Sequence, residues 1–361
     1  MLLVGTTGNG SMDTYAKDLA AHLDVPVLWT DVYEKHDFGL PLLAPRSISL
    51  AWRDARFSSR LRQLRSSVHL PNQHLGRYVL GLPEPFIITV HDLIRYFDMS
   101  NPEVVHITQP NLRDRLYLSK DYSAVCRATA VIANSSATKR DIVRHLGVSE
   151  DRVFVTYPGI DHERFRPVSR RLNAAPYILF VGVEQPRKNF SMLLAAFSLI
   201  KRDPRLRELK LLKIGAAGGV EAPFRESTTA AIARLGLEGD VIIVGRVPGE
   251  DLPAYYSGAQ CLVMPSLAEG FGYPPLEAMA CGCPVVISDC EALTEVAGDA
   301  AEVADVGSAE SLAEAILLLL NGSAKRHQLV ERGLRRAAEF SCARTAMLTR
   351  QVYDALPELQ G

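Results

Sequence analysis

Two carboxylates and two cations are the residues whose types and spacing favour chemistry on a phosphorylated sugar. Glu269 and Glu277 enclose a glycine-rich loop, Gly270-Phe-Gly272, and Arg187 and Lys188 stand side by side before an apolar helical pattern. A carboxylate accepts hydrogen bonds from vicinal hydroxyls, which sugars and ribose present. Adjacent cations in front of a helix N-terminus attract an anion such as a phosphate. These residues predict a site for a nucleotide sugar, and for Arg187 and Lys188 a basic turn exposed to water is the alternative.

The glycine-rich loop connects two predicted elements. The apolar run Gln260–Pro265 indicates a buried strand, and Glu277–Gly282 indicates a short helix that ends at a glycine. Pro275 suits a first helical turn, so we expect Glu277 in the first turn of this helix. Taken alone, the segment also fits a structural role, in which Glu277 stabilises a helix N-terminus and Glu269 is a solvated loop residue.

Composition limits the classes of protein that fit. The 361 residues suffice for about two domains, and 47% hydrophobic with 22% charged residues is ordinary for globular proteins. A net charge of -1 gives no indication of nucleic-acid binding. No apolar run approaches the about 20 residues of a membrane span, and the first residues lack a signal-peptide pattern, so we expect a cytoplasmic protein. The six cysteines form no C-x-x-C pair, which predicts reduced thiols and no metal site.

The order of the predicted elements indicates two α/β domains. A strand at Leu2–Val4, a glycine loop at Gly5–Gly10 and a helix at Met12–Leu23 open the first series, as in a doubly wound sheet. A second series begins with the strand Tyr177–Val181. The segment Pro158–Pro167 interrupts the alternation and is the predicted linker.

A histidine lies at the carboxyl end of a predicted strand. His91 and Asp92 directly follow the apolar run Phe86–Val90. This end of the strands faces the ligand crevice in open α/β sheets, where a histidine can hydrogen-bond a sugar hydroxyl or position an acceptor. A structural histidine that caps the strand end is the alternative for His91, and Asp92 is the weaker candidate of the two.

Residues 39–85 are rich in arginine. They hold seven arginines and only two acids, and Trp52 and Phe57 interleave with the segment Arg53–Arg65 at roughly helical spacing. Such a basic amphipathic face fits an anionic membrane surface or an acidic acceptor. It equally fits a solvated helix face whose arginines pair with acids elsewhere, and the sequence leaves both interpretations open.

Five motifs occur in the order of one known family. They are Thr89-Val-His-Asp-Leu93, Tyr157-Pro-Gly-Ile-Asp-His-Glu-Arg-Phe-Arg-Pro167, Phe180-Val-Gly-Val-Glu-Gln-Pro-Arg-Lys-Asn189, Glu269-Gly-Phe-Gly-Tyr-Pro-Pro-Leu-Glu277, and the run from Pro284-Val-Val-Ile-Ser-Asp289 to Glu295-Val-Ala-Gly298. With these motifs the sequence resembles the GT-B fold glycosyltransferases, in particular the retaining enzymes of glycosyltransferase family 4. The resemblance extends over nearly the whole chain.

The resemblance implies a fold. Two doubly wound, Rossmann-like domains would face a central cleft, with an acceptor-binding domain at 1–165 and a nucleotide-sugar-binding domain at 166–342. The last helix, Ala343–Leu356, would cross back, so that 343–361 would belong to the first domain. Two such domains close around their substrates.

The resemblance also implies a reaction. A sugar, with mannose favoured, would move with retention of configuration from a nucleoside diphosphate sugar to a glycan or a lipid-linked acceptor. GDP-mannose is the favoured donor and a UDP-sugar is second. No cofactor and no metal would be needed, and the lack of a D-x-D triplet agrees with this. The arginine-rich stretch alone suggests that this acceptor lies at the inner membrane face, where the protein would be peripheral.

The matching positions imply roles for single residues. Arg187 and Lys188 would stabilise the departing diphosphate, Glu269 would bind the donor sugar, and His91 would lie near the transferred sugar. The remaining donor contacts would be Glu277 on the ribose, the N–H groups of Gly270, Phe271 and Gly272 on the sugar or phosphate, Arg246 beside the base, and Gly8 and Gly10 near the phosphates.

Two departures from the family pattern affect these roles. Many relatives have arginine directly after the first glycine of the phosphate loop, whereas Val183 follows Gly182 here, so Arg187 or another arginine must compensate. The first loop contains Gly8-Asn-Gly10 in place of adjacent glycines, which weakens the predicted phosphate contact there.

Two other functions remain open from the sequence. Gly5-x-x-Gly8-x-Gly10 follows a strand and Asp31 is suitably spaced for a ribose, which fits an NAD(P)-dependent oxidoreductase or sugar-nucleotide epimerase. The glycine spacing is not G-x-G-x-x-G, and no Tyr-x-x-x-Lys occurs. A catalytically silent carbohydrate-binding relative is the third possibility.

Overall fold

The chain divides into two compact units in a computed structural model. The structure describes residues 1–8, 10–30, 46–101, 103–170, 172, 175–216 and 222–356, without the side chains of 46–51 and 222. The first unit comprises Met1–Ser100, Pro110–Gly159 and Cys342–Gly361, and the second comprises Asn101–Gln109 and Ile160–Ser341. The units divide between residues 159 and 160, six residues before the boundary at 165/166 that the sequence predicts. The second unit also includes Asn101–Gln109, which the sequence pattern did not indicate.

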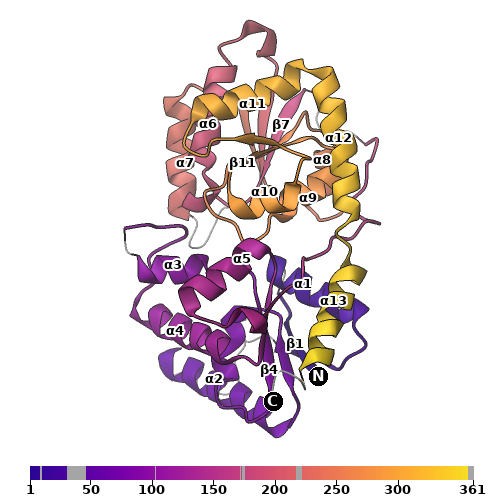
Figure 1. Ribbon diagram of the computed structural model, residues 1–361. Helices are drawn as coiled ribbons and strands as arrows, with labels where there is room; N and C mark the ends of the chain where they lie inside the picture. The colour runs from indigo at the N-terminus through magenta and orange to yellow at the C-terminus, as the bar shows by residue number, and fades with distance from the viewer. Residues whose placement is uncertain are drawn as a thin grey trace. The chain divides into compact units, whose positions relative to one another are not determined.

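The first unit contains a six-stranded parallel sheet in the order β2-β1-β3-β4-β5-β6. Its strands are β1 Leu2–Thr6, β2 Val27–Thr30, β3 Val68–Leu70, β4 Phe86–Val90, β5 Ala130–Ala133 and β6 Val153–Val155. Its helices are α1 Ser11–His22, α2 Arg46–Gln63, η1 Gln73–Tyr78, α3 Ile94–Ser100, α4 Leu112–Arg127, α5 Ser136–Asp141, η2 Ile142–Leu146, η3 Glu150–Arg152 and α13 Cys342–Ala355. Helices cover both faces of the sheet (Figure 1).

Successive residues of the strands supply two separate cores in the first unit. Leu3 and Ile87 face the side of α1 and α13, whereas their neighbours Val4 and Ile88 face the opposite cluster. Alternate side chains of a strand point to opposite faces, and a parallel sheet that is covered on both faces therefore needs a continuous apolar run. This requirement explains why the apolar runs were readable as strands.

The last helix returns to the first unit, as the family resemblance implies. Ala346 and Val352 of α13 pack in the same core cluster as Leu3. Tyr353 Oη lies 2.7 Å from Nδ1 of the fully buried His69 on β3. Burial, with a smaller contribution from the charge of His91, lowers the pKa of His69 to about 3, so this contact joins two neutral groups.

The second unit contains another six-stranded parallel sheet, in the order β12-β11-β10-β7-β8-β9. Its strands are β7 Tyr177–Val181, β8 Lys210–Ile214, β9 Val241–Gly245, β10 Leu262–Met264, β11 Val285–Ser288 and β12 Glu302–Ala304. Its helices are η4 Pro186–Lys188, α6 Phe190–Ile200, η5 Pro204–Leu206, α7 Ala222–Arg234, α8 Leu252–Gly258, α9 Tyr273–Ala280, α10 Glu291–Ala297, α11 Ala309–Asn321 and α12 Ser323–Ala338.

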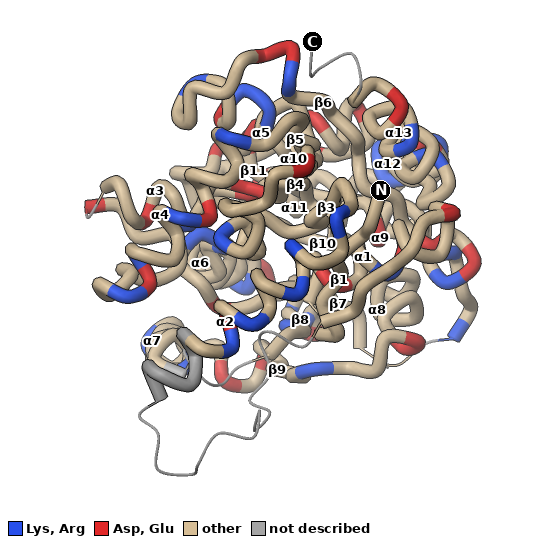
Figure 2. Tube along the Cα trace, turned by 90° about the horizontal axis from the view of Figure 1, so that it is seen from below, with Lys and Arg blue, Asp and Glu red and all other residues tan. Residues whose placement is uncertain are grey.

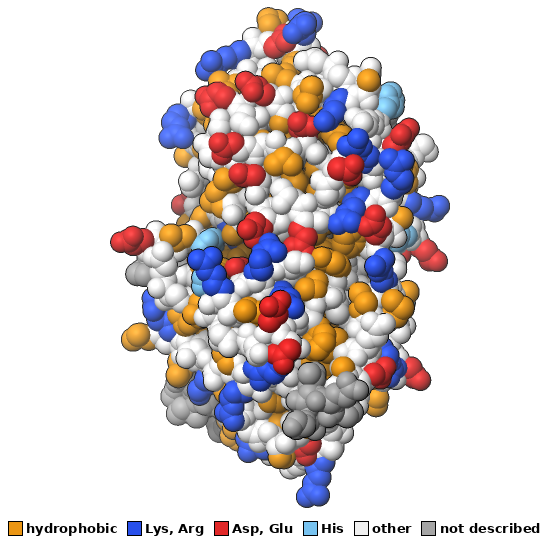
Figure 3. Space-filling model, viewed as in Figure 1, with side chains coloured by type: hydrophobic (Ala, Val, Ile, Leu, Met, Phe, Trp, Pro, Cys, Tyr) orange, Lys and Arg blue, Asp and Glu red, His pale blue; other side chains and the backbone are white. Residues whose placement is uncertain are grey.

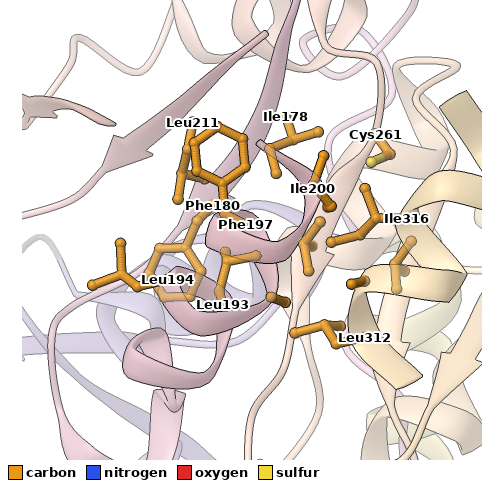
Figure 4. Packing of buried hydrophobic residues seen from close by; sticks show 14 of the residues in the cluster. Ile178, Phe180, Leu193, Leu194, Phe197, Ile200, Leu211, Cys261, Leu312 and Ile316 are labelled. Carbon is orange, nitrogen blue, oxygen red and sulfur yellow. The ribbon is translucent and has the colours of Figure 1, made fainter. Parts of the chain in front are cut away.

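Large apolar side chains of β7 and α6 form the centre of the second core. Phe180 and Phe190 have ring centroids 4.7 Å apart, and Leu193 and Phe197 are fully buried. Figure 4 shows Phe180, Leu193 and Phe197 packed together, with Ile316 of α11 nearby. This packing fixes the start of α6 and therefore the loop that precedes it.

The two ends of the long segment of the second unit lie side by side. Ile160 and Ser341 form a parallel β-bridge, and the N–H of Ile160 donates to the carbonyl of Phe340 at 3.3 Å. The chain therefore enters and leaves this segment at one place.

Two doubly wound parallel sheets confirm the predicted GT-B architecture, with differences in detail. The strand β3 was missed within the arginine-rich stretch. The helix α9 begins at Tyr273, so Glu277 lies beyond the first turn and the prediction for that residue was wrong. Asp31 lies outside the described residues.

The charged surface is mixed in sign. Figure 3 shows basic and acidic side chains interspersed on the face that it presents, in keeping with the net charge of -1. None of the described helices is both long and apolar enough to cross a lipid bilayer.

Candidate active site

The loops that follow β7 and β10 meet at the point where the strand order of the second sheet reverses. Strand β7 has β8 on one side and β10 on the other, and ligands of open α/β sheets bind at the carboxyl ends of strands beside such a point. The N–H of Leu267, after β10, donates to the carbonyl of Arg187, after β7, at 2.7 Å. The sheet topology therefore brings together two motifs that are far apart in sequence.

Glu269 forms ion pairs with both predicted cations. Its Oε1 lies 2.6 Å from Nζ of Lys188, and its Oε2 lies 2.8 Å from Nη1 of Arg187. The side chains of Glu269, Lys188 and Arg187 are only 8%, 9% and 15% exposed. The structure thus joins three of the four predicted catalytic residues in one cluster, with one more positive than negative charge.

The charges of this cluster control the protonation of Glu269. Burial alone would raise the pKa of the carboxyl, but the charges of Lys188 and then Arg187 outweigh burial and lower the pKa to about 2. Glu269 is therefore an ionised hydrogen-bond acceptor at neutral pH, not a proton donor.

The backbone of Arg187 is held on both sides. Its N–H donates to the carbonyl of His106 at 3.0 Å, and its carbonyl accepts the N–H of Leu267. Asn189 has a left-handed backbone with φ 52° and occupies the N-cap position of α6, but its side chain donates to the carbonyl of Val306 at 3.3 Å and does not cap the helix. Arg187 and Lys188 therefore stand before a helix start as predicted.

The glycine-rich loop after β10 depends on one glycine. Gly272 has φ +110°, and an added Cβ would lie 2.7 Å from Cδ2 of Leu293. Phe271 is 3% exposed and stacks edge-on against Tyr273 and Phe340. Only the backbone of Phe271 is therefore available to a ligand. Gly270 lies between this anchored residue and Glu269.

Glu277 is held by a tyrosine that the sequence analysis did not identify. The hydroxyl of Tyr256, a residue of α8 that is 0% exposed, donates to Oε2 of Glu277 at 2.7 Å. Burial raises the pKa of Glu277, while the Tyr256 hydrogen bond and the charge of Arg164 act in the opposite direction. The carboxylate is thereby oriented with its Oε1 left for another donor.

Arg246 lies apart from the ion-paired cluster. It follows β9, which is separated from β7 by β8, and its side chain is exposed. No ion pair or hydrogen bond joins it to any residue within the described ranges. The structure thus does not bring Arg246 together with Glu269, Lys188 and Arg187.

His91 is a buried member of a hydrogen-bonded strand end in the first unit. Its Nε2 lies 2.8 Å from the carbonyl of Pro71, its N–H donates to Oε1 of Gln73 at 3.2 Å, and its ring meets Tyr15 edge-on. Because a carbonyl only accepts, Nε2 carries the proton and Nδ1 of the neutral ring is an acceptor. Burial lowers the pKa of His91 against the opposing effects of the Pro71 carbonyl and Asp92.

The first glycine loop already holds a carboxylate. Asp13 accepts hydrogen bonds from the N–H of Gly10 at 2.8 Å and from the hydroxyl of Thr6, and an added Cβ on Gly8 would lie 2.5 Å from its Oδ2. Lys17 donates to the carbonyl of Gly8 at 2.8 Å. The N–H of Gly10, one of the two predicted phosphate contacts in this loop, is therefore already hydrogen-bonded to a carboxylate.

The structure shows no preformed metal site in the part of the chain that it describes. No group of three or more His, Cys, Asp or Glu side chains there is arranged to hold an ion. Asp92, next to His91, accepts the N–H of Ile94 at 3.0 Å and so stabilises the start of α3.

Comparisons with known proteins cover nearly the whole chain. Residues 14–164 match the family described as Glycosyltransferase Family 4, and residues 161–336 match the family described as Glycosyl transferases group 1. O-antigen chain mannosyltransferase B of Escherichia coli is 32% identical over 299 residues, which make up 80% of this chain and 74% of that protein.

The chain is also similar to a second sequence relative and to a solved structure. A D-inositol 3-phosphate glycosyltransferase of Nocardia farcinica is 31% identical over 64% of this chain, and the match spans about half, 53%, of that relative. The crystal structure of the Anabaena protein HepE in complex with UDP and glucose superposes with a TM-score of 0.77 at 20% identity and covers 99% of this chain and 98% of its own, which is a likeness of fold.

Proposed function

We propose that this chain, which belongs to glycosyltransferase family 4, transfers a mannosyl group with retention of configuration from GDP-mannose to a glycan or lipid-linked acceptor. That it is a GT-B glycosyltransferase follows from the family and the fold. The observation that carries the proposed mechanism is the ion-paired cluster of Arg187, Lys188 and Glu269 at the switch point of the second sheet.

The cluster suits the departure of a nucleoside diphosphate. When the bond between the sugar C1 and the diphosphate oxygen breaks, positive charge grows on the sugar and negative charge grows on the leaving group. Lys188 and Arg187 carry one charge more than Glu269 neutralises, and their burial strengthens their field. We therefore assign both cations to the diphosphate, with no metal required.

Glu269 has two functions in this proposal. Its carboxylate fixes the positions of both cations before the donor binds, since each of its oxygens pairs with one of them. It also accepts a hydrogen bond from a hydroxyl of the donor sugar, for which the additional lone pairs of an ionised carboxylate suffice. Glu277, oriented by Tyr256, accepts the ribose hydroxyls in the same way.

The backbone of the glycine-rich loop and the exposed Arg246 complete the proposed donor contacts. The N–H groups of Gly270, Phe271 and Gly272 meet the sugar or the phosphates, and Arg246 borders the base. In the first unit, Nδ1 of His91 accepts a hydrogen bond from a hydroxyl near the transferred sugar, because its Nε2 is bonded to the carbonyl of Pro71.

Mannose is favoured by the named activity of the Escherichia coli relative, a mannosyltransferase. GDP-mannose is proposed as its donor, as the sequence-based prediction has it. A UDP-sugar is the second donor candidate, because the structurally similar Anabaena protein was solved with UDP and glucose. The D-inositol 3-phosphate glycosyltransferase among the relatives makes a phosphorylated polyol a second kind of acceptor to test.

An exposed stripe on α2 supports a membrane-associated acceptor. Trp52, Arg56 and Arg60 of α2 and Leu64, the first residue after the helix, are all exposed and four residues apart, while Phe57 faces the core. Figure 2 shows the basic positions along α2. Residues four apart share one helix face, and a face on which two cations lie between two large apolar side chains fits the surface of an anionic bilayer. We propose that this stripe holds the protein at the inner membrane face.

A donor panel tests the function. Purified protein is incubated with GDP-mannose, UDP-glucose or UDP-N-acetylglucosamine and a mixture of lipid-linked and phosphorylated-polyol acceptors, and products are identified by mass spectrometry. We expect transfer from GDP-mannose above all other donors, and transfer from a UDP-sugar alone would overturn the donor assignment. Thermal stabilisation by NAD(P) without stabilisation by any sugar nucleotide would overturn the reaction class.

A further inference from the structure

A second ionic cluster lies on the loop that carries Arg187 and Lys188. Glu184, in that loop, has its Oε1 2.8 Å from Nζ of Lys213 on β8. Both oxygens of Glu184 also accept from Nε of Arg225 at 2.8 Å, and Nη2 of Arg225 bonds to Oε1. Arg225 lies near the start of α7. The loop after β7, the strand β8 and the helix α7 are therefore joined through one carboxylate.

The members of this cluster differ sharply in exposure. The side chains of Lys213 and Glu184 are 0% and 1% exposed, whereas that of Arg225 is 26% exposed. Lys213 also donates to the carbonyls of Gly215 at 3.2 Å and Ala216 at 3.4 Å. Arg225 is the member of the cluster that solvent reaches, and its Nη1 makes no hydrogen bond to any residue in the described ranges.

The balance of charge leaves the cluster cationic. One buried carboxylate is shared by two cations, so the pairing of Glu184 with Lys213 and Arg225 leaves one positive charge uncompensated by it. An uncompensated charge at a partly buried position is costly unless an anion or solvent approaches it. The partly exposed guanidinium of Arg225 is where an anion can approach, and its planar fork matches the oxygens of a phosphate.

The cluster is fixed to the phosphate loop by a close backbone contact. Gly215, after β8, has φ +137°, and an added Cβ would lie 2.2 Å from the carbonyl oxygen of Gly182, the first residue of the loop after β7. The N–H of Gly182 donates to the carbonyl of Ile214 at 2.9 Å. Glu184 thus has a defined position between this contact and Arg187, at the carboxyl edge of the sheet.

We propose that Arg225 is a further phosphate-binding residue for the donor, held in place by Glu184 and Lys213. The inference rests on the proposed function, because it assigns Arg225 to the diphosphate of the same donor. Arg225 contributes a guanidinium to one phosphate oxygen from the α7 side of the loop, while Arg187 and Lys188 act from the β10 side. Glu184 and Lys213 are positioning residues that do not touch the donor.

The test compares ligands with and without phosphates. Binding of GDP, UDP and inorganic pyrophosphate is measured by calorimetry, and binding of guanosine and uridine by saturation-transfer NMR, for the full chain and its variants. For Arg225→Gln we expect about a tenfold higher Kd for the preferred nucleoside diphosphate and for pyrophosphate, as for the loss of one charge-assisted hydrogen bond. The Kd of the nucleoside should not change, and Arg225→Lys should recover part of the diphosphate affinity.

Arg234→Gln is the matched control, because Arg234 is an exposed arginine of the same helix α7. It should bind all ligands as the wild type does. Equal diphosphate affinity of Arg225→Gln and wild type overturns the inference, as does an equal loss of nucleoside and diphosphate affinity. If wild type binds neither GDP nor UDP, the proposed function itself fails; if wild type binds and transfers while Arg225→Gln is unchanged, only the role of Arg225 fails.

Discussion

Nζ of Lys188 lies 2.6 Å from Oε1 of Glu269, although 81 residues separate them in sequence. The two residues follow β7 and β10, which are neighbours in the sheet. The contact places a buried cation and a buried carboxylate at the carboxyl end of the second sheet, at the point where its strand order reverses. The first two of the following predictions depend on it.

Replacing Lys188 by alanine should lower kcat of sugar transfer by about 100- to 1000-fold, the usual loss for a group that stabilises charge in a transition state. Arg187 still pairs with Glu269 in this variant, so the fold should persist. Lys120→Ala, which removes an exposed lysine of α4, is the control and should retain full activity. Similar kcat values in the two variants would exclude Lys188 from the reaction.

Glu269 should make stability depend on acid pH. Its folded pKa of about 2 lies below the ordinary 4.5, so the ionised carboxylate stabilises the folded state above about pH 4.5, and this contribution declines as the pH falls toward 2. The stability difference between wild type and Glu269→Gln should therefore shrink by about 2 kcal/mol between pH 7 and pH 3. Urea unfolding at pH 7, 4 and 3 measures it, and a constant difference would contradict the ion pairing.

Tyr256→Phe should weaken nucleotide binding about tenfold and leave kcat at saturating donor nearly unchanged, because Glu277 loses the hydrogen bond that orients it. The neighbouring Tyr255→Phe removes the same atom from a less buried residue and is the matched control. Calorimetric titration with GDP and UDP gives the Kd values. An unchanged Kd for GDP and UDP in Tyr256→Phe would contradict the proposal that Glu277, oriented by Tyr256, binds the ribose.

Tyr353→Phe should lower the free energy of unfolding by about 1–3 kcal/mol, because Nδ1 of the fully buried His69 loses its partner. Amide hydrogen exchange should also become faster along α13 than along α4. Met347→Ala alters an exposed residue of the same helix and should cost less than about 0.5 kcal/mol. Equal unfolding energies for the two variants would show that the His69 contact does not secure α13.

Charge reversal on α2 should release the protein from anionic vesicles. Arg56→Glu with Arg60→Glu should abolish flotation with phosphatidylglycerol vesicles at low salt, whereas neutral phosphatidylcholine vesicles should not bind the wild type. The pair Arg113→Glu with Arg127→Glu makes the same change of charge on α4, where both arginines are exposed, and should leave flotation intact. Loss of flotation in both pairs would indicate a general charge effect.

Local patterns in the sequence were sufficient for most strands and for the motifs beside them. A parallel strand that is buried on both faces requires a continuous apolar run, so Tyr177–Val181 and Phe86–Val90 were recognisable. Strand β3 has only three residues and follows an arginine-rich helix, so no run stood out. Glu277 was assigned to a first turn because the sequence does not show that α9 already begins at Tyr273.

The sequence pattern did not predict which residues far apart in the chain would form contacts. Lys188 and Glu269 were both identified, but only the order of the strands shows that they form one cluster. In the sequence Lys213 resembles an ordinary exposed lysine near a strand end. Its side chain is fully buried against Glu184, from which η4, α6 and η5 separate it along the chain. The position of Asp13 in the sequence suits the first turn of a helix. That its carboxylate accepts the N–H of Gly10 in the first glycine loop is visible only in the structure.

The bridge between Ile160 and Ser341 makes the long segment of the second unit a cassette. Segments whose ends lie side by side can be exchanged between related proteins without stretching the host chain. Residues 160–341 contain the whole sheet of β7–β12. They also contain all the proposed donor contacts of the second unit, from Arg187 to Glu277. A chimera that carries the corresponding segment of a relative should therefore adopt that relative's nucleotide preference while keeping its own acceptor, as expected if donor choice is a modular property of this chain.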